Sequence, residues 1–149
     1  FKDVGKRSGS YFNTKRSGRG LAVLDFDNDG DLDILVSHVD LEASPALLRN
    51  DGSAGNHWLG VTLSGENGLS SGLGAFITVT AGGREQVVVN QWSMGYLSNI
   101  DPRIHLGLGQ ASRIESLEVS WPDGSKQTFE NLPVDRYITI DKENGLVSP

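Results

Sequence analysis

Five aspartates stand within one nine-residue segment, Asp25 to Asp33, whose sequence is Asp-Phe-Asp-Asn-Asp-Gly-Asp-Leu-Asp. Carboxylates occupy loop positions one, three, five and nine, and Gly30 at position six permits a sharp bend that other residues resist. Calcium takes about six to eight oxygen ligands, and alternate side chains of a tightly curled loop can point at one centre. The spacing therefore predicts a calcium-binding loop.

Each aspartate of the loop is assigned a ligand role. Asp25, Asp27 and Asp29 would bind through side-chain oxygens. Asp31 would give its backbone carbonyl, and Asp33 would close the coordination sphere with both carboxylate oxygens. These groups supply about six oxygens and leave room for about one water molecule. Magnesium requires stricter octahedral geometry and zinc prefers His or Cys, which the loop lacks, so calcium is the expected cofactor.

The alternative to a metal site is a solvated acidic turn, and charge repulsion argues against it. At ~5 Å and an effective dielectric constant of ~20, each close pair of carboxylates costs roughly 3 kcal/mol. A divalent cation relieves that repulsion. The loop is not an EF-hand, because strand-like sequence flanks it and it lacks the glutamate that ends an EF-hand loop.

Short apolar runs on both sides of the loop indicate the elements that hold it. Leu21 to Phe26 and Leu32 to Ser37 predict the two strands of a hairpin. Ala46 to Arg49 predicts another short strand. The polar segment from Phe1 to Arg19 predicts a loop or a weak strand.

The segment Asn50 to Gly55 is rich in turn residues and predicts a boundary between a domain at 1–55 and a domain at 56–149. Beyond it, apolar and polar residues alternate, which is typical of half-buried β-strands. The valines within 85–92 predict a strand buried on both sides. We expect an all-β fold in which the calcium-loop hairpin precedes a β-sandwich or a barrel-like domain. The predicted strands of the second domain span 57–63, 75–81, 85–92, 104–108, 115–121, 126–130 and 137–141.

The acidity of the chain is local. Its formal net charge is -6, and the five loop aspartates account for all but one unit of it. No basic stripe is present, which argues against nucleic acid as a partner. No stretch approaches the ~20 apolar residues of a membrane-spanning helix, so we expect no membrane insertion. The chain begins at Phe1 without an initiator Met, which predicts a fragment or processed product of a larger exported protein.

Two stretches of the chain resemble known families. Gly20 to Val36 resembles an FG-GAP/VCBS repeat, through the motif Asp25-x-Asp27-x-Asp29-Gly30-x-x-Asp33 followed by an Ile-Leu-Val run. The stretch from about Asn56 to Asp141 resembles the ASPIC/UnbV domain. The second resemblance rests on His57-Trp58-Leu59, Gly72-Leu73-Gly74-Ala75, Gly95-Tyr96-Leu97-Ser98, His105-Leu106-Gly107-Leu108-Gly109 and Val119-Ser120-Trp121-Pro122-Asp123-Gly124.

The first resemblance implies a calcium-binding blade of a β-propeller, and a single repeat implies only part of such a propeller. The second implies the domain that follows these repeats in cartilage acidic proteins and in many exported bacterial proteins. The biochemical role of that family is largely unassigned, so the resemblance does not by itself supply a function.

We expect an extracellular, calcium-stabilised β module for adhesion, scaffolding or protein interaction, with no enzymatic activity. His38, His57 and His105 lie in separate segments, and no motif brings them together. Ser93 and Ser98 lack the sequence context of a catalytic nucleophile. The partner would be an unidentified protein or a glycan.

The alternative is a carbohydrate-binding module of a polysaccharide-processing exported protein. Trp58, Trp92, Trp121 and Tyr96 could form a sugar-stacking platform, although large aromatic residues in a small β domain more often lie in the core. Exposed and coplanar side chains at Trp92 and Tyr96 would favour the alternative, and core positions would exclude it.

Overall fold

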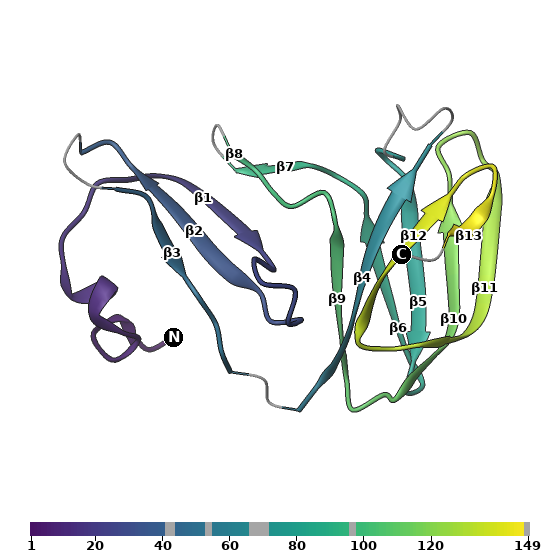
Figure 1. Ribbon diagram of the computed structural model, residues 1–149, viewed down its shortest axis with the longest axis horizontal. Coiled ribbons are helices and arrows are strands. Elements are labelled where there is room, and N and C mark those ends of the chain that lie inside the picture. The colour runs from purple at the N-terminus through teal and green to yellow at the C-terminus, as the bar shows by residue number, and fades with distance from the viewer. Residues whose placement is uncertain (41–43, 53–54, 66–71, 96–97, 148–149) are drawn as a thin grey trace.

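A computed structural model describes the chain apart from residues 41–43, 53–54, 66–71, 96–97 and 148–149. Figure 1 shows a small N-terminal sheet beside a larger β-sandwich. The first segment, expected as a loop or a weak strand, contains two short 3-10 turns, η1 at Gly5–Arg7 and η2 at Ser10–Asn13. Within the described part of the chain, no helix has the length and apolar character needed to cross a membrane.

The N-terminal sheet consists of β1 (Gly18–Leu24), β2 (Asp33–His38) and β3 (Ala46–Leu48), in that order and all antiparallel. β1 and β2 form the hairpin predicted around the acidic loop. Leu24 pairs with Asp33 at the end of the ladder, so residues 25–32 leave the sheet as one tight connection. The hairpin therefore fixes both ends of the acidic loop.

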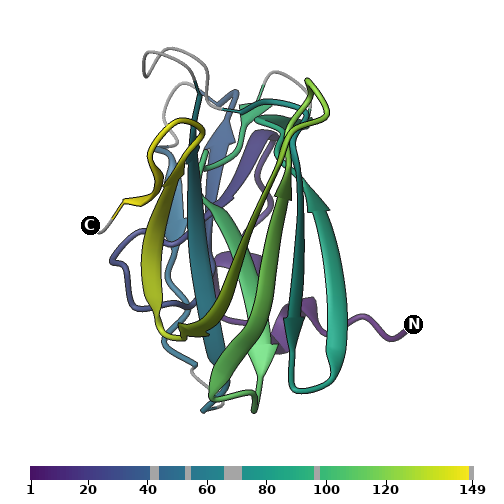
Figure 2. The same cartoon turned by 90° about the vertical axis from the view of Figure 1, so that its right-hand side faces the viewer.

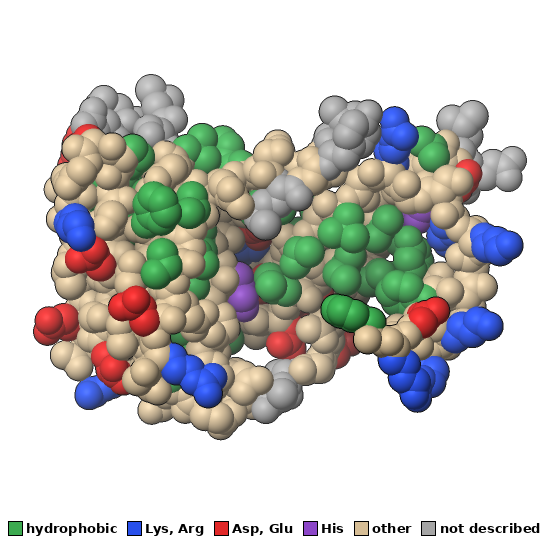
Figure 3. Space-filling model, turned by 180° about the vertical axis from the view of Figure 1, so that it is seen from behind, with side chains coloured by type: hydrophobic (Ala, Val, Ile, Leu, Met, Phe, Trp, Pro, Cys, Tyr) green, Lys and Arg blue, Asp and Glu red, His purple; other side chains and the backbone are tan. Residues whose placement is uncertain are grey.

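Both faces of the N-terminal sheet are apolar. The register places Leu21 and Val23 on one face, and Leu35 and Leu47 on the other. Leu21, Leu35 and Leu47 are all exposed, and no described residue before Leu59 belongs to the buried core. Figure 3 shows apolar side chains gathered on this part of the molecule, at the right of the view. A sheet with two apolar faces is suited to being covered on both sides.

Two four-stranded sheets, counted over the described residues, form the sandwich that faces the viewer in Figure 2. Their strand orders are β11-β10-β5-β6 and β13-β12-β4-β9, and only β12 and β4 pair in parallel. The all-β prediction is confirmed, with a sandwich and not a closed barrel. The strands are β4 (His57–Ser64), β5 (Phe76–Ala81), β6 (Arg84–Val89), β9 (Ile104–Gly109), β10 (Arg113–Ser120), β11 (Lys126–Pro133), β12 (Arg136–Asp141) and β13 (Gly145–Val147).

The core of the sandwich follows the alternation of period two. Leu59 and Val61 on β4 are fully buried, as are Leu117 and Val119 on β10 in the other sheet. Trp121, just beyond β10, is also buried, and its indole N–H donates to the side-chain oxygen of Gln127 at 3.0 Å. The alternation expected of half-buried strands is therefore confirmed in both sheets.

The expectation that the valine run is buried on both sides is wrong. Val88 packs against the core, whereas Val87 and Val89 are 56% and 40% exposed. β6 is the edge strand of its sheet, and only one of its faces meets the other sheet. Three consecutive valines were therefore a sign of β propensity and not of two-sided burial.

Three short strands have no counterpart among the predicted elements. β7 (Ser93–Gly95) and β8 (Ser98–Asn99) pair with each other and lie beside β1. β13 pairs with β12 across a turn in which Asp141 accepts the N–H of Asn144 and Gly145 has φ of 74°. β12 is therefore not the last strand, and the Asn-Gly pair in this turn is a strong hairpin signal.

Candidate metal site at the junction with the sandwich

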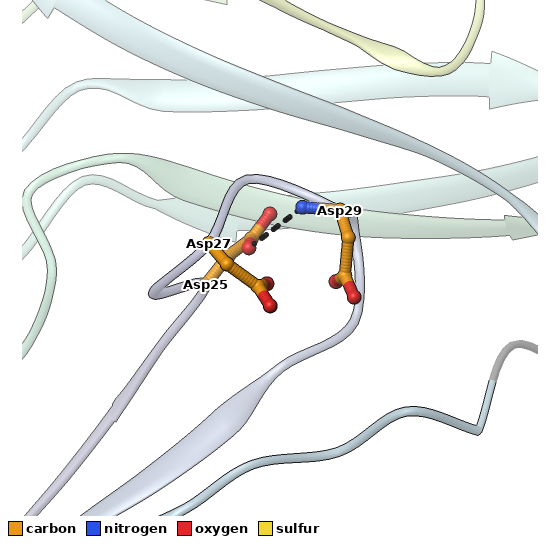
Figure 4. A group of neighbouring side chains, drawn as sticks. All are labelled: Asp25, Asp27 and Asp29. Atoms are coloured by element: carbon orange, nitrogen blue, oxygen red, sulfur yellow. Dashed lines mark hydrogen bonds between the residues drawn. The ribbon is translucent and has the colours of Figure 1, made fainter.

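The acidic loop between β1 and β2 gathers three of its carboxylates. Oxygen atoms from Asp25, Asp27 and Asp29 lie within 4.8 Å of one another. Figure 4 shows these three side chains around one space inside the curl of the loop. Asp25 is buried, whereas Asp27 and Asp29 are exposed. The cluster offers hard oxygen ligands to a cation approaching from solvent.

Backbone hydrogen bonds to the Asp25 carboxylate curl the loop. Its Oδ1 accepts the N–H of Asp29 at 3.2 Å, and its Oδ2 accepts the N–H of Gly30 at 2.9 Å. The N–H of Asp31 donates to Asp29 Oδ1 at 2.9 Å. Asn28 and Gly30 have φ of 62° and 92°. The bend therefore uses two residues with positive φ, whereas the sequence motif predicted a bend at Gly30 alone.

Asp33 lies at the base of the loop, outside the group of three clustered carboxylates. It is almost fully buried, and its Oδ1 accepts the N–H of Asn50 at 2.8 Å while its Oδ2 accepts the N–H of Phe26 at 2.9 Å. Each oxygen keeps a further lone pair. The side chain of Asp31 is likewise outside the group. The assignments of Asp33 as a bidentate ligand and of Asp31 as a carbonyl ligand stay predictions.

Unbalanced negative charge is evident at Asp27. Desolvation raises the pKa of the Asp27 carboxyl, and the charges of Asp29 and Asp33 raise it further. Arg49 opposes this effect from 3.5 Å, but the same exposed guanidinium also pairs with Asp51 at 2.5 Å. One shared surface cation only partly balances the cluster, and a divalent ion would relieve the remaining repulsion.

The loop rests on an aromatic surface of the sandwich. Gly30 packs so closely on Trp58 that a Cβ at Gly30 would lie 2.0 Å from the indole nitrogen. Trp58 stacks on His105 with ring centroids 5.8 Å apart, and it meets Tyr137 edge-on at 5.0 Å. A Cβ at Gly60 would lie 2.1 Å from the Tyr137 ring. Two glycines therefore make room for the aromatic cluster and for the loop that docks on it.

Two polar side chains of the sandwich reach the loop. The Tyr137 hydroxyl donates to Asp25 Oδ2, and Arg103 Nη2 donates to the Asp25 carbonyl oxygen at 2.7 Å. Arg103 also donates to the Asn28 side-chain oxygen and to both carboxylate oxygens of Asp101. Burial and the bond to Asp25 raise the pKa of Tyr137, so its hydroxyl is a donor at neutral pH.

This contact surface has no signal in the local sequence. The Arg103 and Tyr137 bonds to Asp25 join residues 78 and 112 positions apart. Neither residue belongs to a local motif, and Trp58 was considered only as a core or sugar-stacking residue. The glycines at positions 30 and 60 indicate close packing only once the positions of Trp58 and Tyr137 are known.

The three histidines do not converge, in agreement with the sequence analysis. His57 Nδ1 lies 2.7 Å from Asp135 Oδ2, and His38 Nε2 lies 2.9 Å from the Tyr11 hydroxyl oxygen. His105 stacks on Trp58, and burial lowers its pKa. Each imidazole ring has its own structural contact, and no two of the three rings are in contact with each other.

A pocket of about 500 Å³ lies beside the loop, between the N-terminal sheet and the sandwich. Its walls are mostly apolar and include Leu21 of β1, Val88 of β6 and Ile104 of β9. Asp25 and Arg103 also line it, and their polar atoms already take part in the contacts that hold the loop.

Among the candidate sugar-stacking residues that the structure describes, the three tryptophans do not gather on one surface. Trp121 is in the core, and Trp58 packs against Gly30 and His105. Trp92 is 38% exposed. Tyr96, the other residue needed to judge the platform, lies outside the described residues.

Comparison with known proteins gives the family. The profile of the ASPIC and UnbV family matches residues 65–147. Cartilage acidic protein 1 of Mus musculus is 32% identical over 131 residues, which are 87% of this chain and 19% of that protein. The proteins of the same name from Xenopus tropicalis and Homo sapiens are 34% and 33% identical over 108 residues, which are 72% of this chain and 16% of each relative. The chain thus spans less than a fifth of the length of these relatives. With this match and these identities, the chain belongs to the ASPIC and UnbV family.

Proposed function

We propose that the loop Asp25–Asp33 binds a calcium ion and that the ion stabilises an extracellular, non-enzymatic β module. The observation that carries the proposal is the approach of Asp25, Asp27 and Asp29 oxygens to within 4.8 Å on a loop already curled by its own backbone. The donors are all oxygen atoms, which suits calcium. The bound ion would supply charge neutralisation and folding free energy, and no reaction chemistry.

Asp25 would bind calcium through Oδ1. Its Oδ2 already accepts two hydrogen bonds, from the N–H of Gly30 and from the Tyr137 hydroxyl, whereas Oδ1 accepts only one, at 3.2 Å. A carboxylate oxygen has two lone pairs, so Oδ1 has one to give to the ion.

The remaining ligands come from both halves of the loop. Asp27 and Asp29 would bind through their exposed carboxylates, and Asp31 through its backbone carbonyl. Asp33 would add the lone pairs left by its two backbone hydrogen bonds. Water would complete a coordination number of about six to eight.

We also propose that 1–55 forms part of an FG-GAP/VCBS-type propeller blade and that 56–149 forms the ASPIC/UnbV domain. Propeller blades are sheets arranged around an axis, so each blade is covered on both faces. The two apolar faces of the N-terminal sheet fit that arrangement, and Leu21, Leu35 and Leu47 are exposed in this chain. The described core starts at Leu59, which supports a domain boundary close to Gly55.

Adhesion, scaffolding or protein interaction is the proposed role of the module, with a protein or a glycan as its partner. The relatives are named cartilage acidic protein 1, and cartilage is a connective tissue composed largely of extracellular matrix. This name supports an extracellular location. The engagement of His38, His57 and His105 in separate structural contacts supports a role without enzymatic activity.

A carbohydrate-binding role is the second candidate, and the exposure of Trp92 is the observation that favours it. Its indole is 38% exposed and could stack on a sugar ring. Trp58 and Trp121 are engaged in internal packing, so the described residues provide less of a platform than the sequence allowed. Protein interaction therefore remains the first candidate.

Calcium is expected to raise the thermal stability of the chain. Binding to the native state alone adds RT ln(1 + [Ca]/Kd), about 2.7 kcal/mol when calcium is about a hundred times Kd. For a chain of this size each kcal/mol moves the midpoint by roughly 2–4 °C, so a chelator should lower it by about 5–11 °C.

Differential scanning calorimetry with calcium, with magnesium and with chelator measures this shift. Magnesium should give a much smaller shift than calcium. If the two domains unfold separately, only the N-terminal transition should move, which also tests the boundary. Identical midpoints with calcium and with chelator would refute the stabilising role.

A further inference from the structure

We propose that the ASPIC/UnbV domain completes the calcium site of the preceding hairpin, with Tyr137 and Arg103 as positioning residues. The inference rests on the proposed function of the loop. In this arrangement the loop has its full calcium affinity only when it is docked on the sandwich. By thermodynamic linkage, the bound ion strengthens the docking by the same free energy.

Tyr137 orients the buried ligand of the site. Its hydroxyl and the N–H of Gly30 both donate to Asp25 Oδ2, which leaves Oδ1 as the carboxylate oxygen with a lone pair for the ion. The phenol ring is itself held by neighbours. It meets Trp58 edge-on at 5.0 Å and lies over Gly60, where no side chain obstructs it. A rigid strand of the sandwich thus sets the direction of a ligand in another sheet.

Arg103 holds the loop at two points, one on its backbone and one on a side chain. Its guanidinium donates to the Asp25 carbonyl oxygen and to the Asn28 side chain. Asn28 has φ of 62°, a left-handed conformation that non-glycine residues adopt at a cost, and this bond supports it. The ring of Tyr137 lies under the guanidinium, 4.5 Å from its central carbon.

The positive charge of Arg103 is balanced by the carboxylate of Asp101. Asp101 accepts hydrogen bonds from Arg103 on both carboxylate oxygens, at 2.6 to 3.0 Å. The pair therefore brings directed donors to the loop without adding a net positive charge that would repel a cation. Because its charge is already paired, Arg103 can hold the loop in position without taking the place of calcium in neutralising the aspartates.

Tyr137→Phe is the test variant, because it removes the hydroxyl and keeps the ring that packs on Trp58 and Arg103. Second contacts of metal ligands typically change affinity by about 10–100-fold, so the calcium Kd of Tyr137→Phe should rise by at least about 10-fold. Competition with a calcium indicator dye on the whole chain measures Kd. Tyr11→Phe is the matched control, since it removes a hydroxyl bonded to His38 and should leave Kd unchanged.

A second measurement reports on the loop without any metal. Hydrogen exchange at the amides of Asp29 and Gly30, which bond to Asp25, should be faster in Tyr137→Phe than in the unmutated chain, with chelator present. Arg103→Lys keeps the charge but loses the forked donor, so it should weaken calcium binding in the same direction.

The outcomes separate this inference from the proposed function. If the unmutated chain binds calcium and both variants bind it with unchanged Kd and unchanged exchange, the positioning role is wrong. If the unmutated chain binds no calcium, the proposed function fails, and the exchange measurement still decides whether Tyr137 holds the loop.

Discussion

Gly30→Ala should detach the acidic loop from the sandwich and lower the free energy of unfolding by about 2–6 kcal/mol. Two effects add: a side chain is forced at φ of 92°, and its Cβ would lie 2.0 Å from the Trp58 indole. Backbone strain of this kind costs about 1–3 kcal/mol and overpacking costs about 1–3 kcal/mol. Trp58 cannot easily yield, because it is stacked on His105 and in contact with Tyr137.

Gly124→Ala is the matched control for this prediction. Gly124 has φ of 87° and no atom within 4 Å of the position of a Cβ, so the variant has the strain without the clash. Its free energy of unfolding should fall by about 1–3 kcal/mol. The two variants differ by the clash, about 1–3 kcal/mol, so at roughly 2–4 °C per kcal/mol the midpoint of Gly30→Ala should fall about 2–12 °C below that of Gly124→Ala. Equal midpoints would show that the loop is not packed on Trp58.

Asp25→Asn and Asp27→Asn should differ in how their stability depends on calcium. Asp25 is buried, and its carboxylate accepts three hydrogen bonds. In Asp25→Asn the side-chain NH2 group would face N–H or O–H donors and could not accept a hydrogen bond from them. The unfolding free energy should fall by about 1–3 kcal/mol with or without calcium. Asp27 is exposed and lies beside charges that raise its pKa, so Asp27→Asn should be tolerated in chelator.

In calcium Asp27→Asn should also be less stable than the unmutated chain, because it lacks a ligand and should not gain the stabilisation that the unmutated chain gains. Urea unfolding of the three proteins, each with calcium and with chelator, gives the comparison. An unchanged stability of Asp25→Asn in chelator would contradict its role as an anchor. A full calcium response in Asp27→Asn would contradict its role as a ligand.

Local patterns predicted the parts of the fold that depend on neighbours in the chain. The alternation of Leu59, Val61 and Leu63 indicated which face of β4 is buried, because side chains alternate across any strand. The Asp-x-Asp-x-Asp-Gly spacing predicted a curled loop, which the structure contains. Val87 and Val89 were misjudged because the layers that pack on a sheet, and not composition, decide whether β6 has one buried face or two.

The docking of the loop could not be predicted from local patterns. Asp25 meets Tyr137 and Arg103 only after β12 has paired with β4 and β9 has paired with β4 from its other side. The burial of Asp33 by two backbone donors also depends on the path of the chain after β3, where Asn50 returns to the loop. Both contacts belong to the arrangement of sheets, which a short motif does not encode.

Calcium binding by the loop is the central claim, and isothermal titration calorimetry of the whole, chelator-treated chain tests it most directly. We predict one saturable calcium site per chain, much weaker binding of magnesium, and loss of the site in Asp27→Asn. The folded state of both proteins should be checked by circular dichroism before titration. No saturable calcium binding by the folded, unmutated chain, or an undiminished site in Asp27→Asn, would contradict the account.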